Sequence, residues 1–214
     1  LFSPHETADL HDLYGEKFEE RYSEYEFNAK NGDIKNYKSI KAVDLWRKIL
    51  SMLFETGHPW ITFKDPCNIR SPQSHAGVVH SSNLCTEINL PTTPLSHIDD
   101  GDDTDAEIAL CVLAAINLGT IKNLDELEVV CEYIVRGLDS VISYQEYPMA
   151  AARKMLKRRS IGVGVTNFAY WMVKNGLSYD DPASLEKIDE LFENIQYYLI
   201  KASVEVAKEE GPCE

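Results

Sequence analysis

Three side chains that can do polar and thiol chemistry stand at every second position of residues 81–92, SSNLCTEINLPT. They are the amide of Asn83, the thiol of Cys85 and the carboxylate of Glu87. In an extended segment alternate side chains leave the backbone on the same side, so these three groups share one face. A straight strand would hold Asn83 and Glu87 roughly 13 Å apart, too far to touch one small substrate together. The spacing therefore predicts a curved segment, a loop tip with Cys85 at its apex.

The composition is that of a globular protein. The 214 residues fit one domain of ordinary size or a piece of a larger one. Hydrophobic residues make up 44% and charged residues 26%, which argues against disorder. No apolar run is long enough for a membrane span, and the first residues do not read as a signal peptide. The missing initiator methionine and the end at EEGPCE predict a processed or excerpted fragment.

The charge balance limits the partners. Lys and Arg number 21 and Asp and Glu number 35, a net charge of −14 that repels polyphosphate and argues against nucleic-acid polymers. A small phosphorylated ligand is compatible with this charge, because backbone amides and helix N-termini bind phosphate locally. The one basic concentration, residues 152–160, is interpreted as a solvated helix end beside an acidic surface.

The cysteines indicate a reducing compartment. They show neither a CxxC pair nor dense, even spacing, which favours the cytoplasm over a secreted disulfide scaffold. Read alone, the cysteines other than Cys85 are small packed or surface groups, with Cys131 on the apolar face of a helix. The five are Cys67, Cys85, Cys111, Cys131 and Cys213.

Helices alternating with strands predict an α/β architecture with largely parallel strands. Expected helices are residues 39–56 ended by Gly57, 123–144 capped by Asn123, 167–176, and a last helix from Asp181 to Gly211. Expected strands are residues 60–63, 108–116 buried on both faces, and 160–165. Gly162 and Gly164 are attributed to close packing of a barrel strand, since the third glycine of a dinucleotide loop is missing. The acidic turn 96–105 lacks the ligand spacing of a calcium loop, and no metal is expected there.

Four ordered blocks carry a family resemblance over essentially the whole chain. They are SSNLCTEINLPT, EIALCVLAAINLGTIKNLDEL, RRSIGVGVTNFAYW and NIQYYLIKASVEVAKEEG. Together they resemble the catalytic large (alpha) subunit of class I ribonucleotide reductase. The resemblance implies that residues 1–214 are part of its ten-stranded α/β catalytic barrel, with the catalytic cysteine on a loop inside the barrel.

The resemblance also implies roles for single residues. Cys85 matches the cysteine that becomes a thiyl radical, Glu87 the base for the 3′ hydroxyl, and Asn83 the amide that orients the ribose hydroxyls. Cys111 matches one cysteine of a redox-active pair, whose partner is expected upstream of Leu1. Substrate is expected to contact Asn83, Leu84, Cys85, Thr86 and Glu87.

Partners and cofactors follow from the same resemblance. The substrate would be a ribonucleoside diphosphate, reduced with thioredoxin or glutaredoxin as dithiol source. No cofactor or metal is expected on this chain, because the radical would come from a metal-containing small (beta) subunit. A cobalamin-dependent relative uses a similar residue set, but the length of the matched blocks favours the small-subunit class. ATP and dNTP effectors, relay tyrosines, shuttle cysteines and a phosphate loop would belong to other segments of the large subunit, so the fragment is expected to be inactive alone.

A zinc-stabilised, non-catalytic binding module is the alternative function. Its ligands would be Cys67, His75, His80 and Cys85, a mixed sulfur and nitrogen set that could close a tetrahedral site. The intervening gaps of seven, four and four residues do not follow the usual short knuckles.

Overall fold

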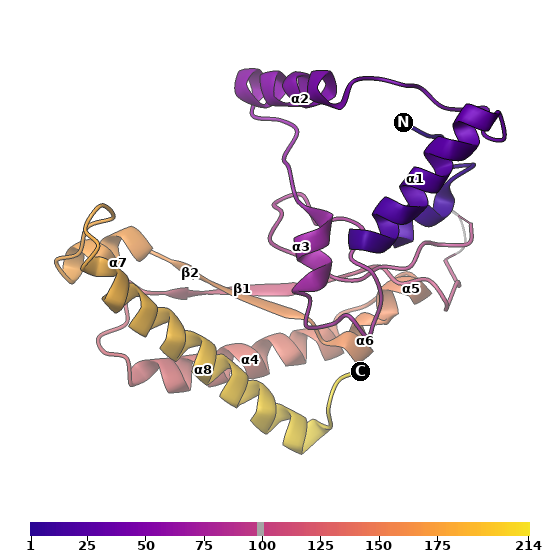
Figure 1. Ribbon diagram of the computed structural model, residues 1–214. Helices are drawn as coiled ribbons and strands as arrows, with labels where there is room; N and C mark the ends of the chain where they lie inside the picture. Colours follow the sequence, from indigo (N-terminus) through magenta and orange to yellow (C-terminus); the bar gives the residue numbers. More distant parts are fainter. Residues whose placement is uncertain (98–100) are drawn as a thin grey trace. The chain divides into compact units, whose positions relative to one another are not determined.

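A computed structural model describes residues 1–97 and 101–214, which form two compact units, Leu1–Pro94 and Leu95–Glu214 (Figure 1). The centre of the acidic turn 96–105, where no metal is expected, lies outside the described residues. Within the described part of the chain, every helix is too short or too polar to cross a bilayer.

The first unit is helical. It contains the 3₁₀ helix η1 (Ala8–Asp12) and the helices α1 (Gly15–Asn31), α2 (Ala42–Thr56) and α3 (Lys64–Ile69). Gly57 ends α2 with φ +75° and donates its backbone N–H to the carbonyl of Leu53 at 2.8 Å. A left-handed glycine at this position is a common helix end, so the stop predicted at Gly57 is confirmed. The helix itself begins three residues later than expected, at Ala42 instead of Ser39.

A small core joins η1 to α1. The buried residues Tyr25, Ala29 and Ile34 pack with the partly buried Phe2 and Leu10. The Tyr25 hydroxyl donates to Asp9 at 2.5 Å, and Arg21 Nε donates to the other Asp9 oxygen at 2.6 Å. These two donors, the tyrosine first, lower the pKa of Asp9. The contacts hold η1 in place, and η1 carries residues that reach the candidate site.

Helix α2 has no fully buried residue in the part of the chain that the structure describes. Of the apolar side chains that recur at helical spacing, Val43, Trp46 and Leu50 are exposed, and Ile49 and Leu53 are half-buried. Leu45, Met52 and Phe54, on the rest of the helix surface, are exposed as well. In Figure 1 α2 lies apart from the other helices of its unit. Amphipathic helices are normally stabilised by burying that face, so this one is left without its usual stabilisation here.

The strand expected at residues 60–63 is not present. These residues are irregular, and no described strand lies beside them to complete a ladder. The β-branched and aromatic side chains suggested a strand, but a strand needs a hydrogen-bonding neighbour. Trp60 and Phe63 are instead exposed.

The second unit is an α/β arrangement built on two parallel strands. Its elements are β1 (Val112–Asn117), α4 (Glu126–Tyr144), α5 (Ala150–Arg153), α6 (Met155–Arg158), β2 (Ile161–Thr166), α7 (Phe168–Lys174) and α8 (Ser184–Glu210). Strand β1 pairs with β2 from Val112 opposite Ile161 to Asn117 opposite Thr166. Parallel neighbours need a long crossover, which α4 to α6 provide. The predicted parallel α/β character is thus confirmed for this part of the chain.

Two helix-start signals act slightly upstream of the helices themselves. Asn123 Oδ1 accepts the backbone N–H of Glu126 at 3.3 Å, although α4 begins only at Glu126. Asp181 Oδ1 accepts the N–H of Ala183 at 2.9 Å, just before α8 begins at Ser184. The caps themselves are Asp125 for α4 and Ala183 for α8, neither with a side-chain cap hydrogen bond, so the cap positions predicted at Asn123 and Asp181 are each two residues too early.

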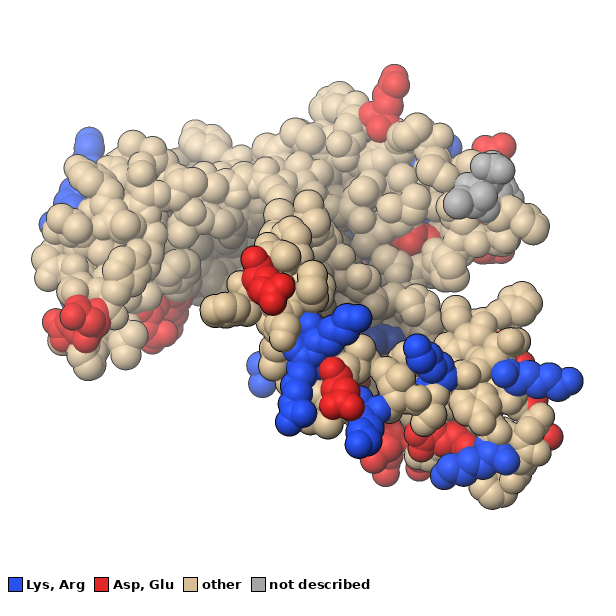
Figure 2. Space-filling view, turned by 90° about the horizontal axis from the view of Figure 1, so that it is seen from above, with Lys and Arg blue, Asp and Glu red and all other residues tan. Residues whose placement is uncertain are grey.

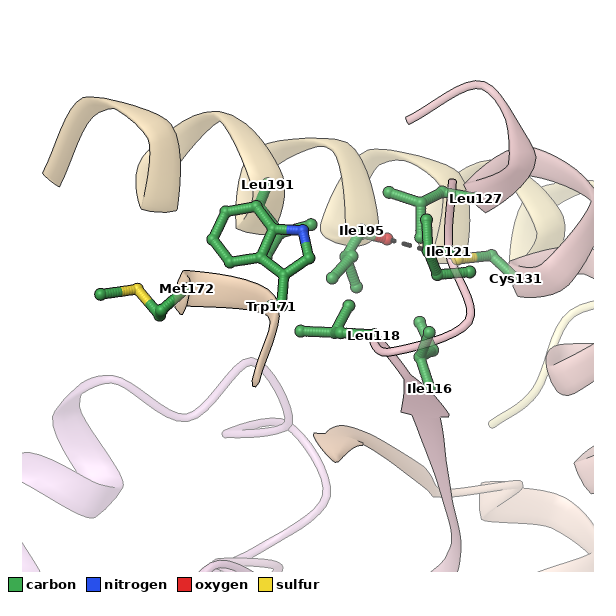
Figure 3. Packing of buried hydrophobic residues seen from close by; sticks show 9 residues of the cluster. All are labelled: Ile116, Leu118, Ile121, Leu127, Cys131, Trp171, Met172, Leu191 and Ile195. Carbon is green, nitrogen blue, oxygen red and sulfur yellow. Dashed lines mark hydrogen bonds between the residues drawn. The ribbon is translucent and has the colours of Figure 1, made fainter. Parts of the chain in front are cut away.

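One face of the β1–β2 pair is buried by α4, α7 and α8. Figure 3 shows the nine buried residues of this core: Ile116, Leu118, Ile121, Leu127, Cys131, Trp171, Met172, Leu191 and Ile195. Cys131 is fully buried on α4, as its place on an apolar helix face predicted, and burial raises the pKa of its thiol to about 11. An inert packed thiol is therefore the correct interpretation of Cys131.

The other face of β1 is open. Leu113 is 54% exposed, and Ala115 and Asn117 are exposed too. The strand predicted over residues 108–116 as buried on both faces is therefore wrong in two respects. It begins only at Val112, and its helices cover a single face, so alternate side chains meet solvent.

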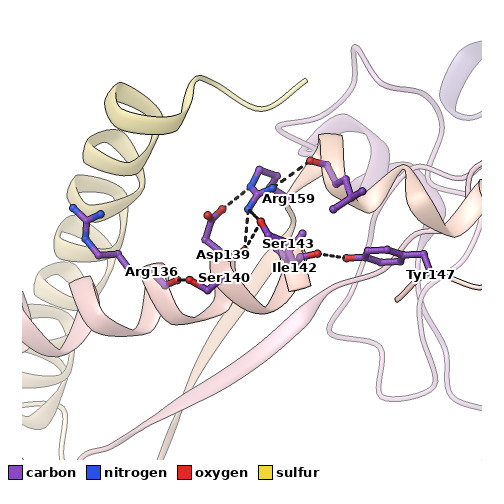
Figure 4. A network of polar contacts seen from close by, with 8 residues as sticks. Arg136, Asp139, Ser140, Ile142, Ser143, Tyr147 and Arg159 are labelled. Atoms are coloured by element: carbon purple, nitrogen blue, oxygen red, sulfur yellow. Dashed lines mark hydrogen bonds and ion pairs between the residues drawn. The ribbon is translucent and has the colours of Figure 1, made fainter. Parts of the chain in front are cut away.

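Polar contacts join α4 to its neighbours, and Figure 4 shows those that Arg159 makes with Asp139 and Ser143. Arg136 on α4 makes a bidentate ion pair with Glu209 on α8, at 2.7 and 2.8 Å. Arg159, at the end of α6, donates from Nε to Asp139 Oδ1 at 2.5 Å and from Nη2 to the Ser143 hydroxyl at 2.9 Å. The first pair is exposed and contributes little, whereas the half-buried Arg159 fixes the turn that leads into β2.

The basic segment 152–160 is largely neutralised by acidic neighbours. Arg158 makes two bonds to the buried Glu107 at 2.8 and 3.0 Å, and Lys157 pairs with Glu214 at 2.9 Å. Figure 2 shows Lys and Arg side chains interspersed with Asp and Glu over one part of the face seen. These contacts favour the interpretation as a solvated, ion-paired helix end.

The core of the second unit predicts a large difference between two leucines of α8. Leu191 is fully buried, so Leu191→Ala should lower the free energy of unfolding by about 2–5 kcal/mol. Leu185 is 65% exposed, and Leu185→Ala should change the free energy of unfolding by under about 0.5 kcal/mol. Thermal melting followed by far-ultraviolet circular dichroism compares the two variants; equal melting temperatures would show that α8 does not pack as described.

Candidate active site

Residues 78–92 form a loop with two legs and a tight tip. The legs are joined where the Thr92 N–H donates to the Val78 carbonyl at 3.2 Å. Near the tip, the Asn83 N–H donates to the Ile88 carbonyl at 3.3 Å, and the Thr86 N–H donates to the Asn83 carbonyl at 3.1 Å. The latter bond closes a turn with Leu84 and Cys85 at its centre. The curvature predicted from the spacing of the site residues, with Cys85 at the apex, is confirmed.

The side chain of Asn83 helps to build the turn. Its Oδ1 accepts the N–H of Ile88 at 3.0 Å, which leaves the Nδ2 group as a donor without a hydrogen-bond partner among the described residues. Thr86 has φ +66°, a left-handed conformation that β-branched residues rarely adopt, and its hydroxyl donates to the Cys85 carbonyl at 2.7 Å. Backbone strain of this kind concentrates at functional sites.

The reactive groups of the tip are presented outward. Cys85 and Glu87 are exposed, and Leu84 between Asn83 and Cys85 is 82% exposed. Within the described part of the chain, neither the Cys85 thiol nor the Glu87 carboxylate takes part in a hydrogen bond or ion pair. The loop thus brings an amide donor, a thiol and a carboxylate to one short turn, where all three can meet a ligand.

The base of the loop is held by a buried residue that the sequence did not single out. Asn68 of α3 is 4% exposed, and its amide makes two bonds to Val79: Oδ1 accepts the N–H at 2.8 Å and Nδ2 donates to the carbonyl at 2.9 Å. Nδ2 also donates to the Lys64 carbonyl at 3.0 Å. Nearby, Cys67 Sγ donates to Asn89 Oδ1 at 3.5 Å. A lone asparagine in a short helix carries no spacing signal that would have identified it.

The proposed zinc ligands do not assemble. Residues 1–97 and 101–214 include all four of them, and no three His, Cys, Asp or Glu side chains of these ranges gather as a metal-ligand set. Cys67 is bonded to Asn89, and His80 to Asp12 and Thr92. The geometry therefore gives no support to the alternative of a zinc-stabilised binding module.

Cys111 lies just before β1, on the face of the sheet that the helices leave open. It is half-buried, and a Cβ added at Gly162 of β2 would lie 3.4 Å from its Sγ and 2.6 Å from Leu113 Cδ2. Because Gly162 has no side chain, Cys111 and Leu113 can lie against it. The prediction that this glycine serves close strand packing is confirmed. For Gly164 that prediction fails, because a Cβ there would meet nothing within 4 Å.

The loop with Cys85 belongs to the first unit and Cys111 to the second. Cys111 lies one residue before β1 and so outside the observed strand, although the strand predicted over residues 108–116 included it. Each unit is described by itself, so the closeness of Cys111 to the Cys85 loop that the resemblance implies stays a prediction. The roles expected for Asn83, Cys85, Glu87 and Cys111 likewise stay predictions from the resemblance.

Comparison with known proteins defines the class to which this chain belongs. Residues 1–214 match the family model for "Ribonucleotide reductase, barrel domain". The chain belongs to this family and forms part of its barrel domain.

Curated relatives and a solved structure agree with that assignment. The ribonucleoside-diphosphate reductase subunit alpha of Chlamydia muridarum is 46% identical over 99% of this chain and 20% of its own length. The corresponding subunit of Haemophilus influenzae is 45% identical over 100% of this chain and 28% of its own length. The class Id ribonucleotide reductase alpha subunit of Actinobacillus ureae matches with a TM-score of 0.64 and 30% identity, over 80% of this chain and 32% of that one. The chain therefore spans only a fifth to just over a quarter of the two curated relatives.

The packing of Cys111 predicts different effects at the two glycines of β2. Gly164→Ala should be neutral or stabilising by up to about 1 kcal/mol, because alanine is less flexible in the unfolded chain and meets nothing in the folded one. Gly162→Ala must displace the Leu113 side chain and should be less favourable than Gly164→Ala by about 1 kcal/mol. Denaturant unfolding measures both; equal stabilities would show that Gly162 does not make this close contact.

Proposed function

We propose that this chain carries the hydrogen-abstraction site of a ribonucleoside-diphosphate reductase alpha subunit. The observation that carries the proposal is the turn that presents Asn83, Cys85 and Glu87 together, in a chain that matches the family along its whole length. The substrate is a ribonucleoside diphosphate, and the product is the corresponding deoxyribonucleoside diphosphate for DNA precursor synthesis.

Each of the three groups has a chemical task in this proposal. The Cys85 thiyl radical takes the 3′ hydrogen of the ribose, a step that suits sulfur because its radical abstracts hydrogen reversibly. Glu87 removes the proton of the 3′ hydroxyl as a general base. The Nδ2 group of Asn83 donates to a ribose hydroxyl while its Oδ1 holds the turn, so substrate and loop are oriented by one side chain. Leu84 and Thr86 complete the surface that contacts substrate.

Cys111 supplies reducing equivalents in this proposal. It forms a disulfide with a second cysteine as the 2′ hydroxyl leaves as water, and the family resemblance puts that partner upstream of Leu1. The one-sided packing of the sheet supports this role: an α/β barrel carries its helices outside, so the face opposite α4 and α8 turns to the interior. That interior face of the ten-stranded barrel is where the Cys85 loop must insert.

The remaining functions belong to other parts of the enzyme. We propose that residues 1–214 fold as one part of the catalytic barrel and depend on the rest of the large subunit for the relay tyrosines, the shuttle cysteines and the phosphate loop. The exposed apolar face of α2 and the small share of the relatives' length support this dependence. The beta subunit supplies the radical, thioredoxin or glutaredoxin supplies electrons, and ATP and dNTPs act as effectors, in a reducing cytoplasm that keeps Cys85 as a thiol.

Cys85→Ser in the full-length alpha subunit should abolish deoxyribonucleotide formation and leave substrate binding largely intact. A serine hydroxyl fills similar space and still hydrogen-bonds, but it cannot replace the thiyl radical. Conversion of a labelled ribonucleoside diphosphate and equilibrium binding of the same nucleotide measure the two effects. Cys213→Ser, at another exposed thiol, is the control and should retain turnover. Turnover in Cys85→Ser would defeat the assignment.

Residues 1–214 by themselves should show no ribonucleotide reduction, even with a beta subunit and a dithiol reductant. The open face of β1 and the apolar face of α2 should also lower stability and favour aggregation. Adding the flanking segments, in one chain or as separate chains, should restore solubility and turnover. The same nucleotide assay, run with and without these segments, checks this; activity of the chain alone would show that it contains more of the machinery than proposed.

A further inference from the structure

His80 lies on the leg that leads into the Cys85 turn, and its side chain is enclosed by the first unit. Its side chain is only 8% exposed, although the residues of the tip lie in solvent. An enclosed imidazole needs partners for its ring nitrogens. Both nitrogens have one, and the two partners come from different segments of the first unit.

The two hydrogen bonds of His80 join three segments. Nδ1 lies 2.8 Å from the hydroxyl of Thr92, which is on the opposite leg of the loop. Nε2 lies 2.7 Å from Asp12 Oδ1, at the end of η1. A neutral ring satisfies both bonds when Nε2–H donates to the carboxylate and Nδ1 accepts from the hydroxyl. The backbone N–H of Thr92 also donates to the Val78 carbonyl. Thr92 therefore joins the two legs twice, through its backbone to Val78 and through its side chain to His80.

The surroundings hold the ring in one orientation. The His11 ring stacks on it, with centroids 4.4 Å apart and planes 12° from parallel. Lys64 donates to the His11 carbonyl, and burial, first among several causes, lowers the pKa of both the His11 and Lys64 side chains. The charged and titratable groups that contact His80 are thus Asp12 and His11, with Lys64 bonded to His11, and none belongs to the tip.

The two bonds differ in how replaceable they are. The Asp12 side chain is 65% exposed, so water can take the place of His80 at that carboxylate. Thr92 is half-buried, and its bond to His80 joins the two legs directly. Loss of the Thr92 bond should therefore let the legs shift against each other and carry Cys85 with them.

We propose that His80 is a positioning residue for the radical site, acting through Thr92 to hold the two legs of the loop in register and so fix where Cys85, Asn83 and Glu87 stand. The inference rests on the proposed function, because it assigns to His80 the alignment of that same site. Small displacements of reacting groups lower the rate of a chemical step much more than they weaken binding.

The test uses the full-length alpha subunit with its beta subunit and a labelled ribonucleoside diphosphate. His80→Ala should lower kcat by about 10- to 100-fold and change KM by no more than about twofold, because misalignment acts on the chemical step. His75→Ala is the matched control, since His75 is exposed and has no hydrogen bond among the described residues; its kcat should equal that of the unmodified enzyme.

Conservative variants separate positioning from general damage to the fold. Asparagine places a polar atom near the Nδ1 position and glutamine near the Nε2 position, so His80→Asn can keep the Thr92 bond and His80→Gln the Asp12 bond. His80→Asn should recover most of kcat, whereas His80→Gln should not. Thr92→Val should reproduce the kcat of His80→Gln, and combining Thr92→Val with His80→Gln should lower kcat no further.

The outcomes distinguish this inference from the proposed function. Unchanged kcat in His80→Ala, together with an inactive Cys85→Ser, would overturn the role of His80 alone. The role of His80 would also be overturned if kcat and the melting temperature fell together in every His80 variant and His80→Asn did not recover kcat. Turnover in Cys85→Ser would instead remove the proposed function itself.

Discussion

The second unit depends on the unequal covering of the two faces of the β1–β2 pair. Helices α4 and α8 pack with Ile116 and its neighbours on one face of the two parallel strands. On the other face Gly162 has no side chain, and Cys111 and Leu113 lie over it. Apolar burial on one side thus frees the opposite side for chemistry, which is the arrangement that an α/β barrel requires of each of its strands.

The Cys85 loop is stabilised in a different way. Its tip exposes an amide, a thiol and a carboxylate, so apolar burial does not hold it. Hydrogen bonds do so instead: Asn68 binds Val79 at the base, His80 bridges the legs, and Asn83 closes the tip. Each bond contributes modestly, but together they restrict a polar loop to one shape on a helical scaffold.

The two kinds of stabilisation support the proposed dependence of this chain on the rest of the large subunit. The loop contributes reacting groups but no enclosure, and the sheet contributes a thiol on an open face. Helix α2 likewise has a well-formed apolar face and nothing in its own unit to cover it. In the proposed enzyme the remaining barrel strands and helices provide the missing surfaces, which also exclude water from the radical chemistry.

The sequence by itself determined the features that depend on near neighbours in the chain. The alternation of Asn83, Cys85 and Glu87 required a turn, Gly57 ended its helix, and the apolar positions of α4 predicted that Cys131 is buried. Only the tertiary structure decided that residues 60–63 are not a strand and that β1 is covered on one face, because both depend on partners distant in sequence. For the same reason, only the tertiary structure showed that His80 is a hydrogen-bonded bridge and not a metal ligand. Its partner Asp12 is distant in the chain, and no sequence motif links Asp12 to the loop.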